Sequence, residues 1–330
     1  MANVRVIGAG IIGLWQSLTL ARRGYSVQLV EASAKPFISS ASRLGAAMLA
    51  PYCEAEASGP LVHLMGVQSL SLWKKVYPHV TANGSVVIAA PRDQPELGRF
   101  ARMTEGGVKL SRDALAKIEP ALAERHENAL YYENEAHVEP GATLPWLLQA
   151  TADAGCKLVF GDGAHGVSEK QPEWVIDCRG MGAASDLPTL RGVKGEMLVV
   201  YTSEITLTRP VRLLHPRFPL YIAPWRDGRF MIGATVIESA EKDTVTVRSA
   251  LDLLSAAFTV HPAFSEARIE GFYAGVRPAY PDNIPKITVR GRRIFVNGAY
   301  RHGYLLAPAL AELVADYIGG LPVDGSPIFN

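Results

Sequence analysis

The chain has 330 residues, of which 48% are hydrophobic and 20% charged, and its formal net charge is +1. This composition excludes a disordered chain, which requires low hydrophobicity and high net charge. A nearly neutral chain gives no electrostatic reason to expect nucleic acid as a partner, and no apolar run reaches the roughly 18 residues that stable membrane insertion needs.

The first thirty residues have the pattern of a strand, a helix and a second strand. Val4–Ile7 is a short apolar run typical of a buried strand, and Leu14–Arg23 has apolar residues at helical spacing, with Gly24 as a stop signal. A second buried-strand run, Val27–Val30, ends at Glu31. Units of this kind build parallel sheets with a right-handed crossover.

The rest of the chain continues with both patterns. We expect helices at Leu61–Tyr77, Ser111–Ile118, Leu144–Ala154, Val245–Phe258 and Gly303–Ile318. We expect strands at Ser85–Ala90, Lys157–Phe160, Glu173–Asp177, Gly195–Tyr201, Tyr221–Pro224, Arg229–Ala234, Ile269–Val276 and Ile294–Asn297. Turn residues separate the strands between 195 and 276, which indicates an antiparallel sheet.

This order predicts an α/β fold with two domains. Residues 1–80, 137–190 and 285–330 are expected to form a Rossmann-like nucleotide-binding domain that the C-terminus completes. Residues 81–136 and 191–284 are expected to form a second domain, built on the antiparallel sheet and inserted into the first.

A phosphate-binding turn is predicted between the first strand and the first helix. Gly8, Gly10 and Gly13 match GxGxxG in the required context: the first allows the tight turn, the second lets backbone approach a pyrophosphate, and the third lets helix and strand pack closely. Glu31 can accept hydrogen bonds from the ribose hydroxyls of an adenosine and would repel a 2′-phosphate, so NADP is disfavoured. The turn itself does not separate FAD from NAD, because both contain an ADP half.

Eight segments together resemble the D-amino-acid-oxidase-type FAD-dependent oxidoreductases, and within them the glycine oxidases of thiamine biosynthesis. They are Val6–Leu14, Ser42–Glu56, His137–Leu148, Trp174–Ala183, Val193–Val200, Tyr221–Val236, Phe272–Ile287 and Gly298–Ile318. The resemblance covers nearly the whole chain. It implies FAD as the cofactor, an FAD-binding first domain and a substrate-binding second domain.

The resemblance also implies which residues contact FAD. They are Gly8, Gly10, Ile11, Ile12, Gly13, Glu31 and Ala32 at the ADP half, Val167 at the adenine end, Ser42, Ala46, Ala47, Met48 and Gly180 along the cofactor, and Tyr300, Arg301, His302, Gly303, Tyr304 and Leu305 near the flavin pyrimidine ring. Some relatives attach FAD to a cysteine in the C-terminal region. This chain has no cysteine after Cys178, so the resemblance implies non-covalent FAD.

Three residues are the candidates for catalysis, and all three are also expected to bind substrate. The resemblance implies that Arg277 binds the substrate carboxylate, that the Tyr221 hydroxyl meets the same group, and that Arg301 lies near the substrate's amino end and the flavin. A planar guanidinium suits bidentate carboxylate binding. Val236 and His302 are further candidates for the substrate pocket.

The implied reaction is oxidative deamination of glycine or another small amino acid, by hydride transfer from Cα to flavin N5. Oxygen is the expected acceptor, giving hydrogen peroxide, and the imine would supply thiazole synthesis. Two alternatives stay open: a D-amino-acid dehydrogenase that passes electrons to a quinone or other carrier, and a flavin-binding protein without turnover. A homo-oligomer is also left open, because helix Leu61–Tyr77 has apolar residues enough to pack internally or against a second copy.

The three cysteines, Cys53, Cys156 and Cys178, are odd in number and widely spaced. They form no CxxC pair, so a disulfide framework and a zinc site are disfavoured and no metal is expected. A reducing compartment fits this usage, and we expect a cytoplasmic protein.

Overall fold

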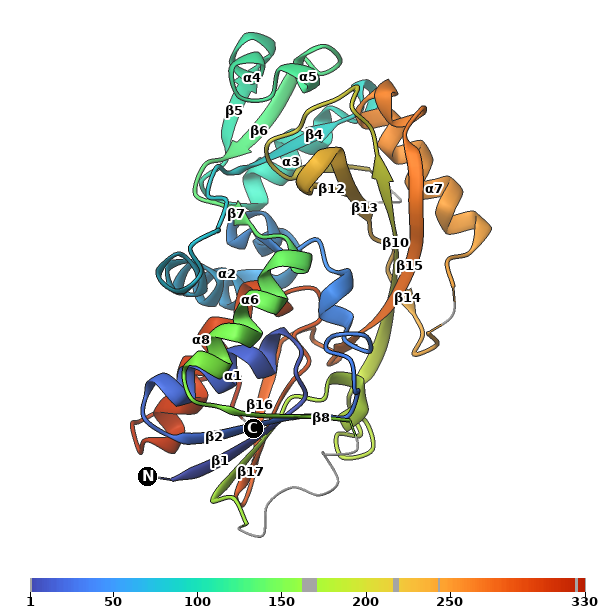
Figure 1. Ribbon diagram of the computed structural model, residues 1–330. Helices are drawn as coiled ribbons and strands as arrows, with labels where there is room; N and C mark the ends of the chain where they lie inside the picture. The colour runs from blue at the N-terminus through green and yellow to red at the C-terminus, as the bar shows by residue number, and fades with distance from the viewer. Residues whose placement is uncertain (1, 162–170, 216–219, 243, 324–325, 330) are drawn as a thin grey trace.

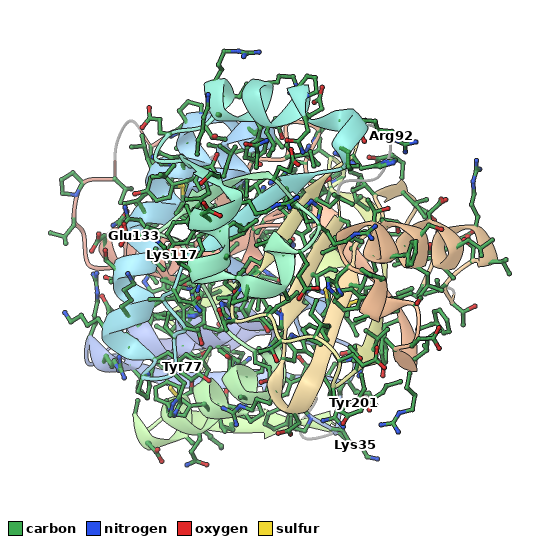
Figure 2. All side chains as sticks on the ribbon, turned by 90° about the horizontal axis from the view of Figure 1, so that it is seen from above. Lys35, Tyr77, Arg92, Lys117, Glu133 and Tyr201 are labelled. Carbon is green, nitrogen blue, oxygen red and sulfur yellow. The ribbon has the colours of Figure 1, made fainter. Side chains whose placement is uncertain are left out.

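The structure is a computed structural model that describes residues 2–161, 171–215, 220–242, 244–323 and 326–329. It contains two large sheets of different construction, one at each end of the molecule (Figure 1). Viewed from above, exposed side chains such as Lys35 and Arg92 extend from the rim (Figure 2). Val167 lies outside the described residues.

The first sheet is largely parallel and has six strands. In spatial order they are β16 (Lys286–Arg290), β17 (Arg293–Asn297), β9 (Trp174–Asp177), β1 (Asn3–Ile7), β2 (Ser26–Glu31) and β8 (Lys157–Phe160). Only β16 runs antiparallel to its neighbour. This is the open, mainly parallel sheet that the first βαβ unit predicts, with β1 at its centre.

Four helices pack above this sheet (Figure 1). They are α1 (Ile11–Arg22), α2 (Pro51–Val76), α6 (Pro140–Asp153) and α8 (Gly303–Ile318). Every residue of α8 from Tyr304 to Ala311 is buried, so this half of the helix is apolar on all sides and lies at the centre of the layer. The indole of Trp73 on α2 donates a 2.8 Å hydrogen bond to the carbonyl of Tyr304, which fixes α2 against the start of α8.

The second sheet has nine strands and is mainly antiparallel. Its strands are β14 (Ile237–Glu238), β10 (Arg191–Tyr201), β13 (Arg229–Gly233), β12 (Leu220–Pro224), β11 (Val211–Leu214), β4 (Ser85–Ala89), β6 (Asn128–Tyr132) and β5 (Val108–Ser111) in spatial order, with β15 (Arg268–Ala279) also paired to β10. Helices α4 (Arg112–Ile118), α5 (Pro120–Ala123) and α7 (Val247–Val260) share a hydrophobic core with it.

The predicted fold class is confirmed, and most predicted elements are present. The helix expected from Leu61 begins earlier, at Pro51, and its helical turns resume after a break at Gly59, where φ is +73°. Among the strands of the two large sheets, β5, β6, β11, β14 and β16 were not predicted. The six-stranded sheet takes its strands from residues before 80, between 137 and 190 and after 285, which are the ranges expected for the first domain. The domain boundaries themselves stay a prediction.

Candidate active site

The predicted phosphate-binding turn has a geometry that only glycine satisfies at two positions. Gly8 has φ +98°, in the left-handed region. A Cβ on Gly13 would lie 1.8 Å from the carbonyl oxygen of Gly8, so any side chain there would force strand and helix apart. In the first turn of α1, the N–H of Ile11 donates to Ser42 Oγ, whereas those of Ile12 and Gly13 find no acceptor within the described part of the chain. The turn therefore presents free donors at a helix N-terminus, as a pyrophosphate requires.

Glu31 lies at the end of β2, beside this turn. Its carboxylate accepts hydrogen bonds from the backbone N–H groups of Ala9, at 2.9 Å, and Ser33, at 3.0 Å. Glu31 thus holds the turn closed and remains within the cavity lining, where a ribose would meet it.

A cavity of about 600 Å³ extends from this turn to the second sheet. The predicted residues that line it are Gly8, Gly10, Ile11, Ile12, Glu31, Ala32, Ser42, Ala46, Ala47, Met48, Gly180, Tyr221, Arg277, Tyr300, Arg301, His302, Gly303, Tyr304 and Leu305. Gly13 does not line the cavity; it packs against Gly8 and Cys178. Val236 is 47% exposed and is not part of this wall, so the structure does not bring it to the other candidates.

The predicted flavin-side segments are tied together at the start of α8. The hydroxyl of Tyr304 donates to the carbonyl of Ser42 at 2.9 Å, which links the segment after β2 to the C-terminal run. Tyr300 and Ala47 both have positive φ, +49° and +51°, so each turns the backbone sharply where the segment lines the cavity. The cradle of glycines, free helix-start donors and Glu31 fits a dinucleotide whose other end reaches the second sheet.

Arg277 extends from β15 into the cavity. Its Nη1 donates to the carbonyl of Thr235 at 3.1 Å, and no carboxylate of the described residues lies within 4 Å of it. Burial, together with the positive charge of Arg301, lowers the pKa of Arg277 to about 10, so it is still charged at neutral pH. A partly buried guanidinium that lines a cavity and has no acidic partner is suited to bind an anion.

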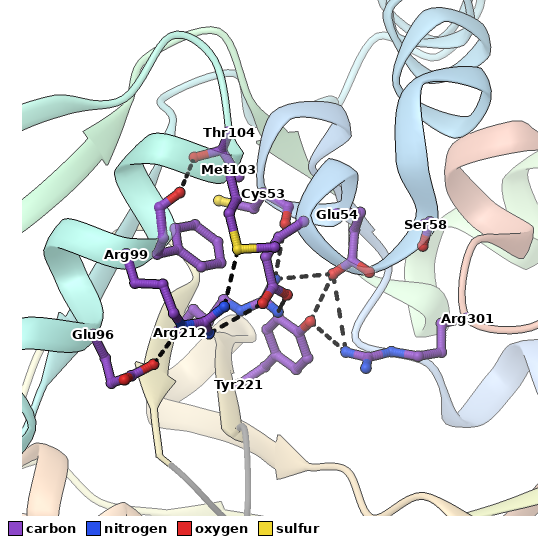
Figure 3. Close-up of polar contacts among 12 residues, drawn as sticks. Cys53, Glu54, Ser58, Glu96, Arg99, Met103, Thr104, Arg212, Tyr221 and Arg301 are labelled. Atoms are coloured by element: carbon purple, nitrogen blue, oxygen red, sulfur yellow. Dashed lines mark hydrogen bonds and ion pairs between the residues drawn. The ribbon is translucent and has the colours of Figure 1, made fainter.

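Tyr221 and Arg301 are brought together, but by a residue that the sequence analysis did not single out (Figure 3). The hydroxyl of Tyr221 donates to Glu54 Oε1 at 2.6 Å and accepts a hydrogen bond from Arg301 Nη2. Arg301 Nη2 is also 3.9 Å from Glu54 Oε1. Glu54 falls within the segment Ser42–Glu56 that carries part of the family resemblance. The feature that could have indicated it is an acidic residue in the first turn of a helix, here the helix that begins at Pro51.

Two neighbouring arginines favour the anionic form of Glu54. Burial alone would raise its pKa, but Arg301 and Arg212 outweigh that effect and hold the pKa of Glu54 at about 2. This value excludes Glu54 as a general base near neutral pH.

Arg212, on β11, is the second unpredicted charge at this end of the cavity. Its guanidinium lies 3.5 Å from Glu54, 3.6 Å from Glu56 and 3.1 Å from the carbonyl of Cys53. The rings of Phe100 and Tyr221 pack near it, with centroids 4.9 and 5.1 Å from its central carbon. Arg212 does not line the cavity, and these contacts stabilise the acidic residues that lie next to it.

His302 is buried between Ser58 and Glu54. Its Nε2 is 2.6 Å from Ser58 Oγ and its Nδ1 is 3.5 Å from Glu54 Oε2. Burial lowers the pKa of His302 to about 4, against the opposing effect of Glu54, so the ring is neutral at pH 7. A neutral imidazole adds no charge to the site.

Comparison with known proteins identifies the family. The family model described as FAD dependent oxidoreductase (DAO) matches residues 3–317. The chain belongs to this family of FAD-dependent oxidoreductases. Its cofactor is FAD, which confirms the choice of FAD over NAD that the resemblance implied.

Individual relatives agree with this placement. The chain is 46% identical to the putative thiamine biosynthesis oxidoreductase ThiO of Rhizobium etli, over 95% of both chains. It is 26% identical to a glycine oxidase of Bacillus licheniformis, over 96% of this chain and 93% of that one. A crystal structure of glycine oxidase from Geobacillus kaustophilus has the same fold, with a TM-score of 0.82 at 23% identity over 98% of this chain and 96% of that one.

Two further features, a membrane-spanning helix and a metal site, are absent from the described part of the chain. No helix there is long and apolar enough to cross a membrane. Nor do the described residues contain a group of three or more side chains arranged to hold a metal ion.

Proposed function

We propose that this oxidoreductase catalyses the oxidative deamination of glycine or another small amino acid, with oxygen as acceptor and hydrogen peroxide and an imine as products. The proposal rests on one observation: the guanidinium of Arg277 lines the cavity and has no acidic partner among the described residues. Its charge matches the carboxylate that every amino acid has. The relatives named for glycine oxidation and for thiamine biosynthesis support glycine as the substrate and thiazole synthesis as the use of the imine.

The chain's own residues hold the substrate rather than exchange protons with it. Arg277 binds the carboxylate in a bidentate manner and fixes the position of Cα. The neighbouring wall of Met197 and Met231 is apolar and excludes water from the reacting carbon. FAD, held by the Gly8–Gly13 turn, Glu31 and the start of α8, supplies the acceptor for the hydride from Cα.

General acid–base catalysis has no candidate side chain at this end of the cavity among the described residues. Glu54 is ionised but already accepts a hydrogen bond from the Tyr221 hydroxyl, and the ring of His302 is hydrogen-bonded to Ser58. This agrees with a reaction in which the neutral amine loses hydride directly, so that the protein contributes orientation and electrostatics.

We also infer that FAD is bound non-covalently, because Cys178 borders the phosphate-binding turn rather than the substrate end. We infer a cytoplasmic location, because Cys53, Cys156 and Cys178 are free thiols.

Anaerobic reduction tests the proposal. Glycine, sarcosine and D-alanine are added in turn to the FAD-loaded protein while the flavin band is recorded. Bleaching by glycine, followed by recovery and peroxide formation on admission of air, is the expected result. Bleaching without recovery in air would favour the dehydrogenase that uses another carrier, and a spectrum that no amino acid bleaches would contradict turnover of amino acids.

The matched variants are Arg277→Ala and Arg226→Ala. Arg226 is an exposed arginine of the same sheet, 3.4 Å from Glu139 and outside the cavity lining. Arg277→Ala should raise the glycine concentration needed for half-maximal reduction by about a hundredfold, because a charge-assisted pair contributes roughly 3 kcal/mol. Arg226→Ala should leave it unchanged.

A further inference from the structure

Three arginines approach the substrate end of the cavity, and two of them are neutralised. Arg301 lies against Glu54, and Arg212 lies between Glu54 and Glu56. Arg277 has no carboxylate within 4 Å among the described residues. Among these arginines and their acidic partners, with His302 neutral, three positive charges stand against two negative ones, and the uncompensated charge is on Arg277.

The position of Glu54 is fixed by hydrogen bonds to the backbone of the residue before it. The N–H of the preceding residue, Cys53, donates to Glu135 Oε1 at 2.7 Å, and the carbonyl of Cys53 accepts from Arg212 at 3.1 Å. Glu135 is fully buried and also accepts from Ser85 Oγ. The first turn of α2 is therefore held by two side chains from other elements, Glu135 and Arg212, which place Glu54 against Tyr221 and Arg301 (Figure 3).

We propose that Glu54 is a specificity-determining residue: by neutralising Arg301 it limits the site to a ligand with one carboxylate, held by Arg277. This inference rests on the proposed function, in that Arg277 is taken to bind the carboxylate.

A dicarboxylic ligand would bring a second carboxylate into the cavity. Such a group would need a second uncompensated cation, because burying an unpaired anion is costly. Of the three arginines named above, Arg277 and Arg301 line the cavity, and the donors of Arg301 point to Tyr221 and Glu54. A second carboxylate beside it would face the Glu54 anion across a few ångströms, and like charges at that distance repel. The Met197 and Met231 wall offers no alternative donor.

The test uses two ligands that cannot be oxidised at an amine: acetate, with one carboxylate, and malonate, with two. Each is titrated calorimetrically into the FAD-loaded protein. The wild-type protein should bind malonate no more tightly than acetate. Glu54→Gln keeps an acceptor for the Tyr221 hydroxyl but removes the charge, so the Kd for malonate should fall about tenfold or more relative to that for acetate.

Two further variants keep the inference falsifiable. Glu56→Gln is the matched control, since Glu56 contacts Arg212 and Arg99 but does not line the cavity, and the ratio of the two Kd values should stay within about threefold of wild type. Arg301→Gln leaves Glu54 less compensated and should shift the ratio the opposite way, further against malonate. This second variant decides the matter if Glu54→Gln fails to fold.

The outcomes separate the inference from the proposed function. Tighter binding of malonate than of acetate by the wild type, or an unchanged ratio in Glu54→Gln, would overturn the role of Glu54. An unchanged ratio in Arg301→Gln would overturn it too. Acetate binding that survives Arg277→Ala at wild-type affinity would instead overturn the carboxylate assignment in the proposed function, whatever the Glu54 variants do.

Discussion

The guanidinium of Arg277 occupies the space that a side chain on Gly195 would take. A Cβ on Gly195 would lie 2.1 Å from Arg277 Nη2 and 2.4 Å from its central carbon. The two residues lie on the adjacent strands β10 and β15, where Gly195 pairs with Gly275 and Arg277 with Val193. The arginine therefore lies flat across its neighbouring strand, and its direction depends on the absence of a side chain there.

Gly195→Ala should displace Arg277 without removing it. We expect the KM for glycine to rise about tenfold or more, because a bidentate contact tolerates little displacement, while the protein still folds and binds FAD. Steady-state kinetics with glycine check this. Gly98→Ala is the control, since a Cβ there would meet nothing closer than 3.7 Å, and an unchanged KM in both variants would contradict the packing argument.

Tyr221→Phe removes the hydroxyl that joins Glu54 and Arg301. The buried Glu54 oxygen loses its donor, so we expect the free energy of unfolding to fall by about 1–3 kcal/mol. Urea denaturation monitored by fluorescence measures it. In a Glu54→Gln background the same substitution should cost less, because the acceptor is then uncharged; equal losses in the two backgrounds would show that the bond to Glu54 is not what stabilises Tyr221.

Glu135→Gln should change how stability depends on pH. Burial raises the pKa of Glu135 to about 7, against hydrogen bonds from Ser85 and Cys53 that lower it, whereas the unfolded chain has a pKa near 4.5. The folded protein therefore keeps a proton that the unfolded chain releases, and this group's contribution to stability is lost as pH rises from about 4.5 to 7.

The variant has no such loss. Relative to wild type, Glu135→Gln should be more stable at pH 8 than at pH 5, by up to about 3 kcal/mol. Chemical denaturation of both proteins at the two pH values gives the difference, in which the other titrating groups cancel. A wild-type-minus-variant difference that is the same at both pH values would contradict a raised pKa at this position.

Gly13→Ala should abolish FAD retention. The added methyl would lie 1.8 Å from the Gly8 carbonyl, so the turn cannot keep its shape. The absorbance of flavin per mole of purified protein measures retention. Gly141→Ala is the matched control, because Gly141 is also in the first turn of a helix and its Cβ would meet nothing closer than 3.8 Å; it should retain FAD fully.

The cofactor half of the site could be predicted because its signals are local. Gly8, Gly10 and Gly13 stand within one turn, and Glu31 follows at the end of the next strand, so one stretch of sequence contains the whole pattern. The helix expected at Ser111–Ile118 also has a local signal, because the Oγ of Ser111 accepts a hydrogen bond from the N–H of Ala114 at its start. The family match confirms FAD, while the individual contacts stay predictions.

The charged centre around Glu54 could not be predicted in the same way. Its partners Tyr221 and Arg301 lie far along the chain, and nothing in the sequence shows that one carboxylate will serve both. Strand β11 was missed for a related reason: Arg212 interrupts its apolar run, yet it is buried because Glu54, Glu56 and the Cys53 carbonyl compensate it. A charged residue in a sequence suggests an exposed position until its partners are known.

The six-stranded sheet has consequences for the order in which the protein is made. Strand β9 lies between β1 and β17, and the first helix, α1, packs against the last, α8. A ribosome therefore releases the phosphate-binding turn early, and the helix that backs it only after all the segments between them. Until Gly303–Ile318 has left the exit tunnel, the nascent chain has no closed pocket in which to capture its flavin, so flavin loading must wait for this helix to emerge.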